Sequence, residues 1–365
     1  MVAAARQDAI LRELELRGSL STEAFANRMG VTGMTARRDI VDLERRGLLV
    51  RVHGGAISLA VAQEQTRQDD ARGDRRVPAR PIATIGMIVP TTNYYFPEVI
   101  RGASQAAREL NCRLVVGATN YSADEELRQA RRLVGAGVDA LMITPHDMST
   151  DVSELRDFLE SSRVPVVLVE RGVEESRAGR LEWVRSDHVH GAEIAVRHLS
   201  EQGHHRIALA ARPAATVGSL QEGFERAVGR LGAAGHGLFR NLAMPGAGDN
   251  VTLGDIDALL DECIDQGITA AIILGDTDSM ALTDRAIERG LRIPEDFAVI
   301  AYDDEVSAFA AVPLTAIAPP KRELGHAALR LCFDRLAQAA DAPHTIVRMI
   351  LLPALVVRDS TVRAS

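Results

Sequence analysis

The feature that most constrains the fold of this 365-residue chain is a set of short apolar runs that recur from residue 85 onward. The first four runs begin 26 to 29 residues apart, and patterns typical of amphipathic helices lie between them, near 97–110, 123–135 and 150–161. Apolar runs that alternate with helices indicate parallel strands buried on both faces, in βαβ units. The runs are Ile85–Val89, Leu114–Ala118, Ala140–Ile143, Val166–Val169, Ile207–Ala210, Ala271–Leu274 and Phe297–Ala301.

A single open sheet of this length would be unusually large, so we expect residues 82–365 to form two doubly wound α/β lobes. In such lobes a ligand binds at the carboxyl ends of the parallel strands. The predicted division gives lobe 1 the residues 82–187 and 321–346, and lobe 2 the residues 188–318 and 349–362. The chain would therefore cross between the lobes three times.

Residues 1–57, called the head below, have a different pattern from residues 82–365, called the body. Apolar side chains at helical spacing predict three short helices, with Ser21 and Thr32 as N-caps of the second and third. Short strands then follow around Leu48–Val52 and close on a Gly-Gly turn. This order predicts a winged helix-turn-helix, in which the third helix enters the major groove of DNA. Residues 58–81 show little apolar periodicity and are interpreted as a linker.

The charge distribution agrees with this division. The formal net charge of the chain is −8, whereas its first 60 residues hold nine arginines against seven acids. The head is therefore slightly basic and the remainder acidic. A basic head on an acidic body is typical of a DNA-reading domain attached to a domain with another task.

The head also resembles a known family. The stretches Val31–Ile40 (VTGMTARRDI) and Arg51–Ala56 (RVHGGA) are similar to the N-terminal domain of DeoR-family transcriptional regulators over about 55 residues. Thr32 stands where serine is usual, and Ala36 where isoleucine is usual. The resemblance implies a winged helix-turn-helix that binds DNA.

Within the head, candidate DNA contacts come from the third helix and from the wing. Arginine can bind guanine or phosphate through two parallel hydrogen bonds. Alternatively, Arg37 or Arg38 of the helix pairs with Asp39 or Glu44 on a solvent-exposed face. Contacts from the wing would bind phosphate, which positions the protein without reading sequence. The candidates are Thr32, Thr35, Arg37, Arg38, Arg51 and His53.

The body resembles the effector domain of the LacI/GalR family, which is built like the periplasmic sugar-binding proteins. The resemblance extends over about 280 residues in order. It implies two lobes with a small-molecule effector between them. The matching stretches include Ile85–Pro90, Asn93–Phe96, Val138–Leu141, Pro165–Arg171, Gly203–Ala208, Asp278–Ala281, Ile293–Asp296, Ala301–Asp304 and Pro313–Ile317.

Carried over position by position, the resemblance assigns seven residues to the effector pocket. They come from the segments that follow the apolar runs, where aromatic rings and carboxylates suit a sugar. For Tyr95 and Phe96, a place in the core is the alternative. The seven are Asn93, Tyr95, Phe96, Glu170, Arg171, Thr277 and Asp303.

Four departures from the family pattern bear on the effector. Leu220 stands where an arginine is common, Asn250 where an aromatic is common, and Pro319 where a glutamine is common, while Glu170 replaces an aspartate. Without the arginine and the aromatic ring, the predicted pocket is less suited to an ordinary free hexose. A smaller, less polar or modified sugar, or an effector that is not a sugar, remains open.

Several other chemistries have no support in the sequence. The nucleotide-binding patterns GxGxxG and GxxxxGK[ST] and the hydrolase patterns HExxH and GxSxG are absent in the required context. The three cysteines are far apart and read as buried thiols, so neither a metal nor a cofactor is expected. The first residues lack the features of a signal peptide, and no run is long enough to span a membrane, which favours a cytoplasmic protein.

The sequence therefore predicts a transcriptional regulator, not an enzyme, that represses a carbohydrate uptake or catabolism operon. Its expected partners are an operator DNA and a sugar-like effector. The chain would act as a homodimer, or as a tetramer built from it, with no membrane partner. The alternative is a small-molecule sensor that does not act through DNA.

Overall fold

The computed structural model describes most of the chain. In the N-terminal part it describes residues 6–7, 9–11, 14, 19–29, 31–45, 49–52 and 55–57, and beyond it residues 81–146, 154–172, 179–244, 253–338 and 345–362. The chain divides into two compact units, Met1–Arg80 and Pro81–Ser365, and each is described by itself. Apart from Pro81, the predicted linker lies outside the described residues.

The N-terminal unit combines short helices with a small antiparallel sheet. Strand β3 (Gly55–Ile57) pairs with β2 (Val50–Val52) on one side and with β1 (Ser19–Ser21) on the other. Helices α2 (Thr22–Met29) and α3 (Gly33–Arg45) precede the β2–β3 pair, and the helical residues Ile10 and Leu14 are buried with them. The predicted winged helix-turn-helix is confirmed, and β1 is a strand that the sequence analysis missed.

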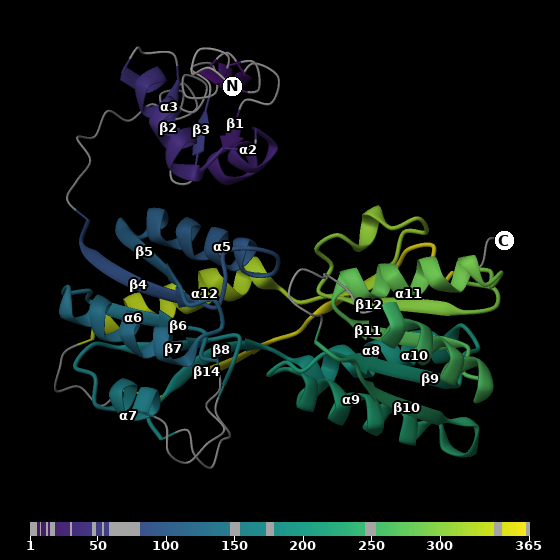
Figure 1. The fold of residues 1–365 in the computed structure, drawn as a ribbon. Coiled ribbons are helices and arrows are strands. Elements are labelled where there is room, and N and C mark those ends of the chain that lie inside the picture. The colour runs from purple at the N-terminus through teal and green to yellow at the C-terminus, as the bar shows by residue number, and fades with distance from the viewer. Residues whose placement is uncertain are drawn as a thin grey trace. The chain divides into compact units, whose positions relative to one another are not determined.

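Lobe 1 is a six-stranded parallel sheet in the order β14-β8-β7-β6-β4-β5 (Figure 1). Helices α5 (Phe96–Glu109) and α12 (Lys321–Leu336) pack on one face, and α6 (Ala123–Gly135) and α7 (Glu154–Glu160) on the other. The strands are β4 (Ala83–Val89), β5 (Cys112–Ala118), β6 (Ala140–Ile143), β7 (Val166–Val169), β8 (Glu182–Ser186) and β14 (Arg348–Leu351).

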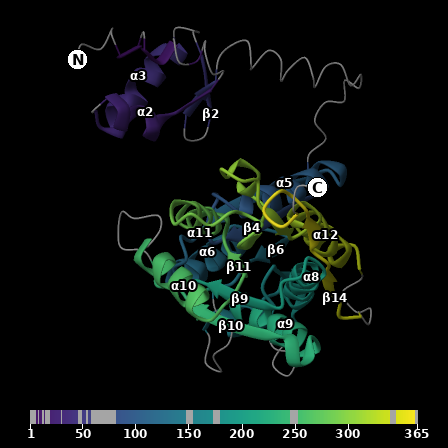
Figure 2. The same cartoon turned by 90° about the vertical axis from the view of Figure 1, so that its right-hand side faces the viewer.

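Lobe 2 is a second six-stranded sheet, in the order β10-β9-β11-β12-β13-β15, and only its β13–β15 pair is antiparallel. Helices α8 (His188–Glu201) and α9 (Val217–Arg230) cover one face, and α10 (Leu253–Asp265) and α11 (Asp276–Glu288) cover the other (Figure 2). The strands are β9 (Arg206–Ala211), β10 (His236–Asn241), β11 (Ala270–Leu274), β12 (Ala298–Tyr302), β13 (Thr315–Ala318) and β15 (Ala354–Val356).

Six of the seven predicted apolar runs lie within strands, and the seventh begins one residue before β12, at Phe297, so the predicted α/β class with two largely parallel sheets is confirmed. The chain passes between the lobes three times, from β8 to α8, from β13 to α12, and from β14 to β15. Residues 349–351, expected in lobe 2, instead belong to lobe 1, because β14 pairs in parallel with β8. Within the described residues, no helix is long and apolar enough to cross a membrane.

Two glycines allow α5 and α12 to pack closely in lobe 1. A Cβ atom added at Gly102 would lie 1.8 Å from the carbonyl oxygen of Arg322, and one added at Gly325 would lie 1.9 Å from that of Val99. Each helix therefore rests directly on the backbone of the other. Because α12 begins at a crossover, this contact also fixes where the chain enters lobe 1 from lobe 2.

We expect Gly102→Ala to destabilise the protein by about 3 kcal/mol or more, because backbone atoms cannot yield as a flexible side chain can. The control is Gly229→Ala in α9, where an added Cβ meets nothing within 4 Å. That substitution should be neutral or stabilise the protein by about 0.5 kcal/mol. Urea unfolding followed by circular dichroism measures both, and equal stabilities of the two variants would contradict the packing described.

Candidate functional site

Helix α3 carries three of the six predicted DNA contacts, Thr35, Arg37 and Arg38. Thr32 precedes the helix, and its Oγ1 accepts a hydrogen bond from the Thr35 N–H at 3.2 Å, which caps the helix as predicted. Ala36 and Ile40 are buried in the core of the unit. The helix therefore turns another face outward, on which Arg38 is exposed together with Met34, one turn earlier and 82% exposed. The sequence analysis did not select Met34.

The other candidates are less fully placed. Arg37 lies in α3 and Arg51 in β2, but their side chains are outside the described part of the structure, and so is the whole of His53. The alternative partner Asp39 is buried and is bound by Arg6, whose Nε lies 2.7 Å from Asp39 Oδ2. Asp39 therefore anchors the start of the unit to α3.

In the body, the buried carboxylate of Glu170 lies at the carboxyl ends of the lobe 1 strands. The Tyr95 hydroxyl donates a hydrogen bond of 2.7 Å to Glu170 Oε1. The other oxygen, Oε2, accepts bonds from the Ser186 N–H at 3.2 Å and the Ser186 hydroxyl at 3.0 Å. Tyr95 and Phe96 belong to the core cluster of lobe 1, as the alternative interpretation proposed, although the Tyr95 hydroxyl serves this polar group.

His188 extends this network into lobe 2. As the first residue of α8, it places Nε2 3.0 Å from Glu170 Oε1 and Nδ1 2.9 Å from the hydroxyl of Tyr302, which ends β12. Burial acts to raise the pKa of Glu170, but the contacts with His188, Tyr95 and Ser186 outweigh it and hold this pKa below its usual value. A continuous chain of buried polar contacts thus joins the ends of β7 and β12.

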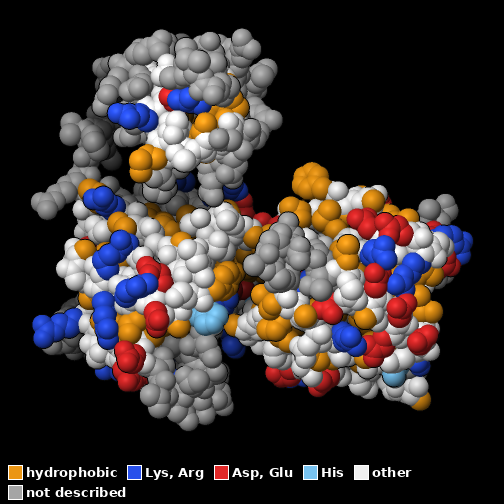
Figure 3. Space-filling view, viewed as in Figure 1, with side chains coloured by type: hydrophobic (Ala, Val, Ile, Leu, Met, Phe, Trp, Pro, Cys, Tyr) orange, Lys and Arg blue, Asp and Glu red, His pale blue; other side chains and the backbone are white. Residues whose placement is uncertain are grey.

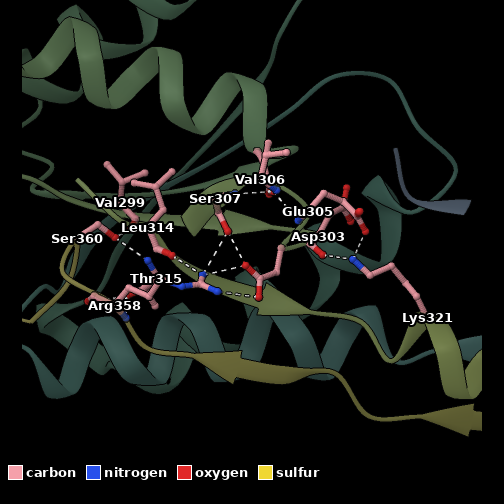
Figure 4. A network of polar contacts seen from close by, with 12 residues as sticks. Val299, Asp303, Glu305, Val306, Ser307, Leu314, Thr315, Lys321, Arg358 and Ser360 are labelled. Carbon is pink, nitrogen blue, oxygen red and sulfur yellow. Dashed lines mark hydrogen bonds and ion pairs between the residues drawn. The ribbon is translucent and has the colours of Figure 1, made fainter. Parts of the chain in front are cut away.

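Asp303 follows directly after β12. Its N–H donates to the Ile317 carbonyl oxygen at 3.0 Å, and its own carbonyl oxygen accepts a hydrogen bond from Lys321 Nζ. Lys321 also pairs with Glu305, as Figure 4 shows, and its Nζ lies 5.2 Å from the centre of the Tyr95 ring. The sole lysine of the chain, at the start of α12, therefore ties lobe 1 to this loop of lobe 2.

The same loop is fixed from two further directions. The carboxylate oxygen Oδ2 of Asp276 accepts hydrogen bonds from the N–H groups of Glu305, Val306 and Ser307, at 2.6 to 3.0 Å. On the other side, the Arg358 guanidinium lies 2.8 Å from Asp304 Oδ1 and donates to the Leu314 carbonyl oxygen (Figure 4). The backbone that presents Asp303 is therefore rigidly held.

The remaining predicted pocket residues are more scattered. Arg171 donates to the carbonyl oxygens of Pro145 and His146, at 2.7 and 3.3 Å, and so holds the segment that follows β6. Thr277 is exposed in the first turn of α11, and Asn93 is exposed after β4. Of the seven predicted pocket residues, Tyr95, Glu170 and Asp303 lie in or beside the polar chain between the lobes, and Phe96 packs in the core.

Several residues of this region were not selected as site residues by the sequence analysis. Tyr94 accepts a hydrogen bond of 3.0 Å from the Asp276 N–H, another link between lobes 1 and 2. His188 and Lys321 lie at crossovers, and only the positions of the lobe boundaries could have selected them. Asp278 pairs with Arg212 through two contacts of 2.7 Å, so its carboxylate is already neutralised.

The departures from the family pattern differ in their surroundings. Leu220 is fully buried in the α8–α9 side of the lobe 2 core, and Pro319 is buried beside the second crossover. Asn250 lies outside the described residues. Among the residues that the structure does describe, no cluster of three histidine, cysteine or acidic side chains could hold a metal ion.

Comparison with known proteins matches both units. Residues 6–61 match the model of the DeoR-like helix-turn-helix domain, and residues 196–361 that of the periplasmic binding protein-like domain. The HTH-type transcriptional repressor PurR of Vibrio atlanticus is 29% identical over 260 residues, which are 69% of this chain and 74% of that protein.

Solved structures share the fold of the body. A LacI family transcriptional regulator from Enterococcus faecium with bound ribose has a TM-score of 0.61 and 24% identity, over 77% of this chain and all of that one. The ribose operon repressor protein from Lactobacillus acidophilus has a TM-score of 0.64 and 16% identity, over 77% of this chain and 98% of that one. These likenesses extend across both lobes.

A buried acid near this site generates a pH prediction. Glu126 in α6 is 1% exposed, and burial raises its pKa to about 7, against smaller opposing effects of the His146 N–H and Arg171. A raised carboxyl pKa stabilises the fold below the unfolded-state value and loses that effect as pH rises through 7. Glu126→Gln should therefore increase stability at pH 8 by up to about 3 kcal/mol relative to wild type, and change it little at pH 4.5.

Urea unfolding at pH 4.5, 6 and 8 measures this effect. Asp124→Asn is the matched control, because Asp124 is exposed in the first turn of the same helix. Its stability should follow the wild-type pH profile. A Glu126→Gln variant with that same profile would contradict the assignment.

Proposed function

Because the chain joins a DeoR-like helix-turn-helix domain to an effector domain of the LacI/GalR type, we propose that it represses a carbohydrate uptake or catabolism operon in response to a sugar-like effector. Binding to DNA and control by a small molecule come with these two domains. The proposal adds the sugar-like effector and the kind of operon. It describes a cytoplasmic binding protein rather than an enzyme.

The observation that carries the proposal is the polar chain Tyr95–Glu170–His188–Tyr302 between the lobes. Buried polar groups from the two lobes meet at the carboxyl ends of β7 and β12, and such strand ends are where α/β proteins bind ligands. The E. faecium regulator of the same fold is a structure with bound ribose. We place the effector of this chain beside Asp303, with Asn93, Phe96, Arg171 and Thr277 as further candidates.

Effector binding would act by changing the angle between the lobes. The three crossovers form a hinge, and a ligand shifts such an equilibrium only by its differential affinity for the two shapes. Couplings of this kind are typically about 1–3 kcal/mol. The contacts of His188 and Lys321 span the hinge, so they would change with the lobe angle.

On the DNA side, α3 would enter the major groove. Thr35, Arg37 and Arg38 would reach base edges or phosphates, with Thr32 at the helix N-terminus beside the DNA backbone. Arg51 and His53 of the wing would bind phosphate. On the face of the body seen in Figure 3, acidic and basic side chains are interspersed over lobe 2, as on an ordinary soluble surface.

Two heads reading a roughly palindromic operator require a dimer. Lobe 2 carries a large exposed apolar side chain, Phe309 at 82% exposure, directly beyond the loop that presents Asp303. In lobe 1, Val116 on the edge strand β5 is 38% exposed. We assign these residues to the interface of a homodimer, and a tetramer would need a further surface.

The proposal is tested by selecting bound fragments from the source genome with the full-length protein at about 150 mM salt. We expect a few strong sites beside genes for sugar transport or metabolism. Strong sites beside unrelated genes would overturn the carbohydrate assignment. No enrichment by the folded protein, with and without an extract of source-cell metabolites, would overturn the DNA-binding role and favour a sensor that acts without DNA.

Arg38→Ala should weaken binding to a selected operator about 10- to 100-fold, because one charged contact to base or phosphate is lost. The slope of log affinity against log salt should fall by about one if the contact is a phosphate. Arg230→Ala, which removes an exposed arginine of lobe 2, is the control and should bind as wild type does. Fluorescence anisotropy across a salt series decides the role, and unchanged affinity of Arg38→Ala would remove Arg38 from the interface.

Phe309→Ser should shift the dimer towards monomer by at least about tenfold in its dissociation constant, because an exposed aromatic at an interface contributes about 2 kcal/mol or more. The control is Met244→Ser, since Met244 is 64% exposed in the same lobe. Sedimentation equilibrium measures both proteins. A Phe309→Ser variant with the wild-type association constant would place the interface elsewhere.

A further inference from the structure

Two polar links between the lobes share the side chain of Tyr95. Its hydroxyl donates a hydrogen bond to Glu170, whose carboxylate lies 3.0 Å from His188 Nε2. The ring of Tyr95 takes part in the second link, because Lys321 Nζ lies over it, 5.2 Å from its centre. Burial, and then the charge of Glu170, raise the pKa of the Tyr95 hydroxyl, which therefore keeps its proton and remains a donor.

The two links meet again in lobe 2. His188 Nδ1 lies 2.9 Å from the hydroxyl oxygen of Tyr302. The next residue along the chain, Asp303, accepts a hydrogen bond from Lys321 at its backbone carbonyl oxygen. The contacts therefore close a circuit, which passes to lobe 2 at the first crossover and back to lobe 1 at the second. We call this circuit the inter-lobe ring, and its members in order are Tyr95, Glu170, His188, Tyr302, Asp303 and Lys321.

The lobe 2 part of the inter-lobe ring is held firmly within its own lobe. Asp276 Oδ2 accepts hydrogen bonds from the backbone N–H groups of residues 305–307, and Arg358 holds the other side of this loop. Figure 4 shows Lys321 reaching the loop from the start of α12, where it pairs with Glu305. The partner of Lys321 therefore moves with lobe 2.

The lobe 1 part is fixed as well. Lys321 is the first residue of α12, and Gly325, one turn later, rests on the backbone of α5, where an added Cβ atom would lie 1.9 Å from the Val99 carbonyl oxygen. Each end of the Lys321–Glu305 pair thus belongs to its own lobe, so a change in lobe angle acts directly on this pair. Both side chains are largely buried, and separating a buried pair costs more than separating an exposed one.

We propose that Lys321 is a positioning residue and that the inter-lobe ring opens and closes as one unit. The closed ring holds the lobe angle of this structure, and its opening releases that angle. Because Tyr95 serves both links, losing one link weakens the other, as expected of a polar network. This inference rests on the regulator proposed above and adds the contacts that carry the effector's signal between the lobes.

The ring can be followed through Lys321, because this residue is the only lysine of the chain. The full-length protein is treated with an amine-acetylating reagent, and mass spectrometry measures the rate of reaction at Lys321. Arg108→Lys adds a reference amine, since Arg108 is exposed on α5 of lobe 1. We expect Lys321, at 8% exposure, to react at least about tenfold more slowly than this reference.

His188→Ala breaks the ring at the other crossover. It should raise the acetylation rate of Lys321 at least about fivefold in a protein that urea unfolding shows to be folded. Tyr95→Phe keeps the aromatic ring against Lys321 but loses the hydrogen bond to Glu170, so it should act in the same way and replaces His188→Ala if that variant does not fold. His190→Ala is the control, because His190 is half-buried in the same turn of α8, and Lys321 should then react as in wild type.

The same ring should act on DNA binding. Lys321→Met and His188→Ala should each change the affinity for a selected operator by at least about fivefold, and in the same direction, because both open one ring. The double variant should change the affinity by no more than the larger single effect, since a ring that is already open has no further contact to lose. Fluorescence anisotropy measures the wild type and all three variants.

Acetylation of Lys321 at the wild-type rate in both His188→Ala and Tyr95→Phe would overturn the proposal. Additive effects on operator affinity, or no effect of either single variant, would overturn it too. Failure of the proposed function is recognised separately. A protein that selects no operator refutes the regulator, and the acetylation rates still decide whether the ring acts as one unit.

Discussion

The buried contact between Glu170 and His188 is the interaction on which the arrangement of the two lobes depends. A carboxylate at 6% exposure is costly to bury unless hydrogen bonds and a positive or donor group compensate it. Here the compensation comes from Tyr95 and Ser186 of lobe 1 and from His188, the first residue of lobe 2. Because both lobes supply partners, any hinge motion that separates them must also replace these contacts.

The close packing of α5 and α12 carries the same constraint into lobe 1. Gly102 and Gly325 bring the two helix backbones into contact, and α12 begins at Lys321, which reaches the Asp303 loop of lobe 2. Since α5 and α12 are in backbone contact at these glycines, a change in that loop would act on lobe 1 through the start of α12. This rigid connection suits a protein in which a ligand beside Asp303 has to be sensed elsewhere.

The sequence predicted the buried parallel strands well, because burial on both faces produces continuous apolar runs. Strand β8 was missed since Glu182 and Arg185 interrupt its apolar pattern, although Glu182 is 4% exposed and is bound by Arg335 from α12. The edge strand β10 was also missed. It is only half-buried, so its sequence does not form a continuous apolar run. The sequence also directed attention to the carboxyl ends of the strands, where the polar chain between the lobes lies. The sequence did not reveal which carboxylates are paired with basic side chains, because their partners, such as Arg212 for Asp278, lie far away in sequence.

Residues with a strained backbone gather at the same strand ends as the buried polar side chains. Among the described residues, seven that are not glycine have a positive φ, and six of these follow the carboxyl ends of β4, β5, β7 or β12. Left-handed backbone costs such residues about 1–2 kcal/mol each, which glycine would avoid. At Glu170 the side chain repays the strain by joining the lobes, and at Tyr94 by reaching Asp276. At Asp303, whose φ is 109°, no described residue uses the carboxylate, and strain of this kind supports the effector position proposed above.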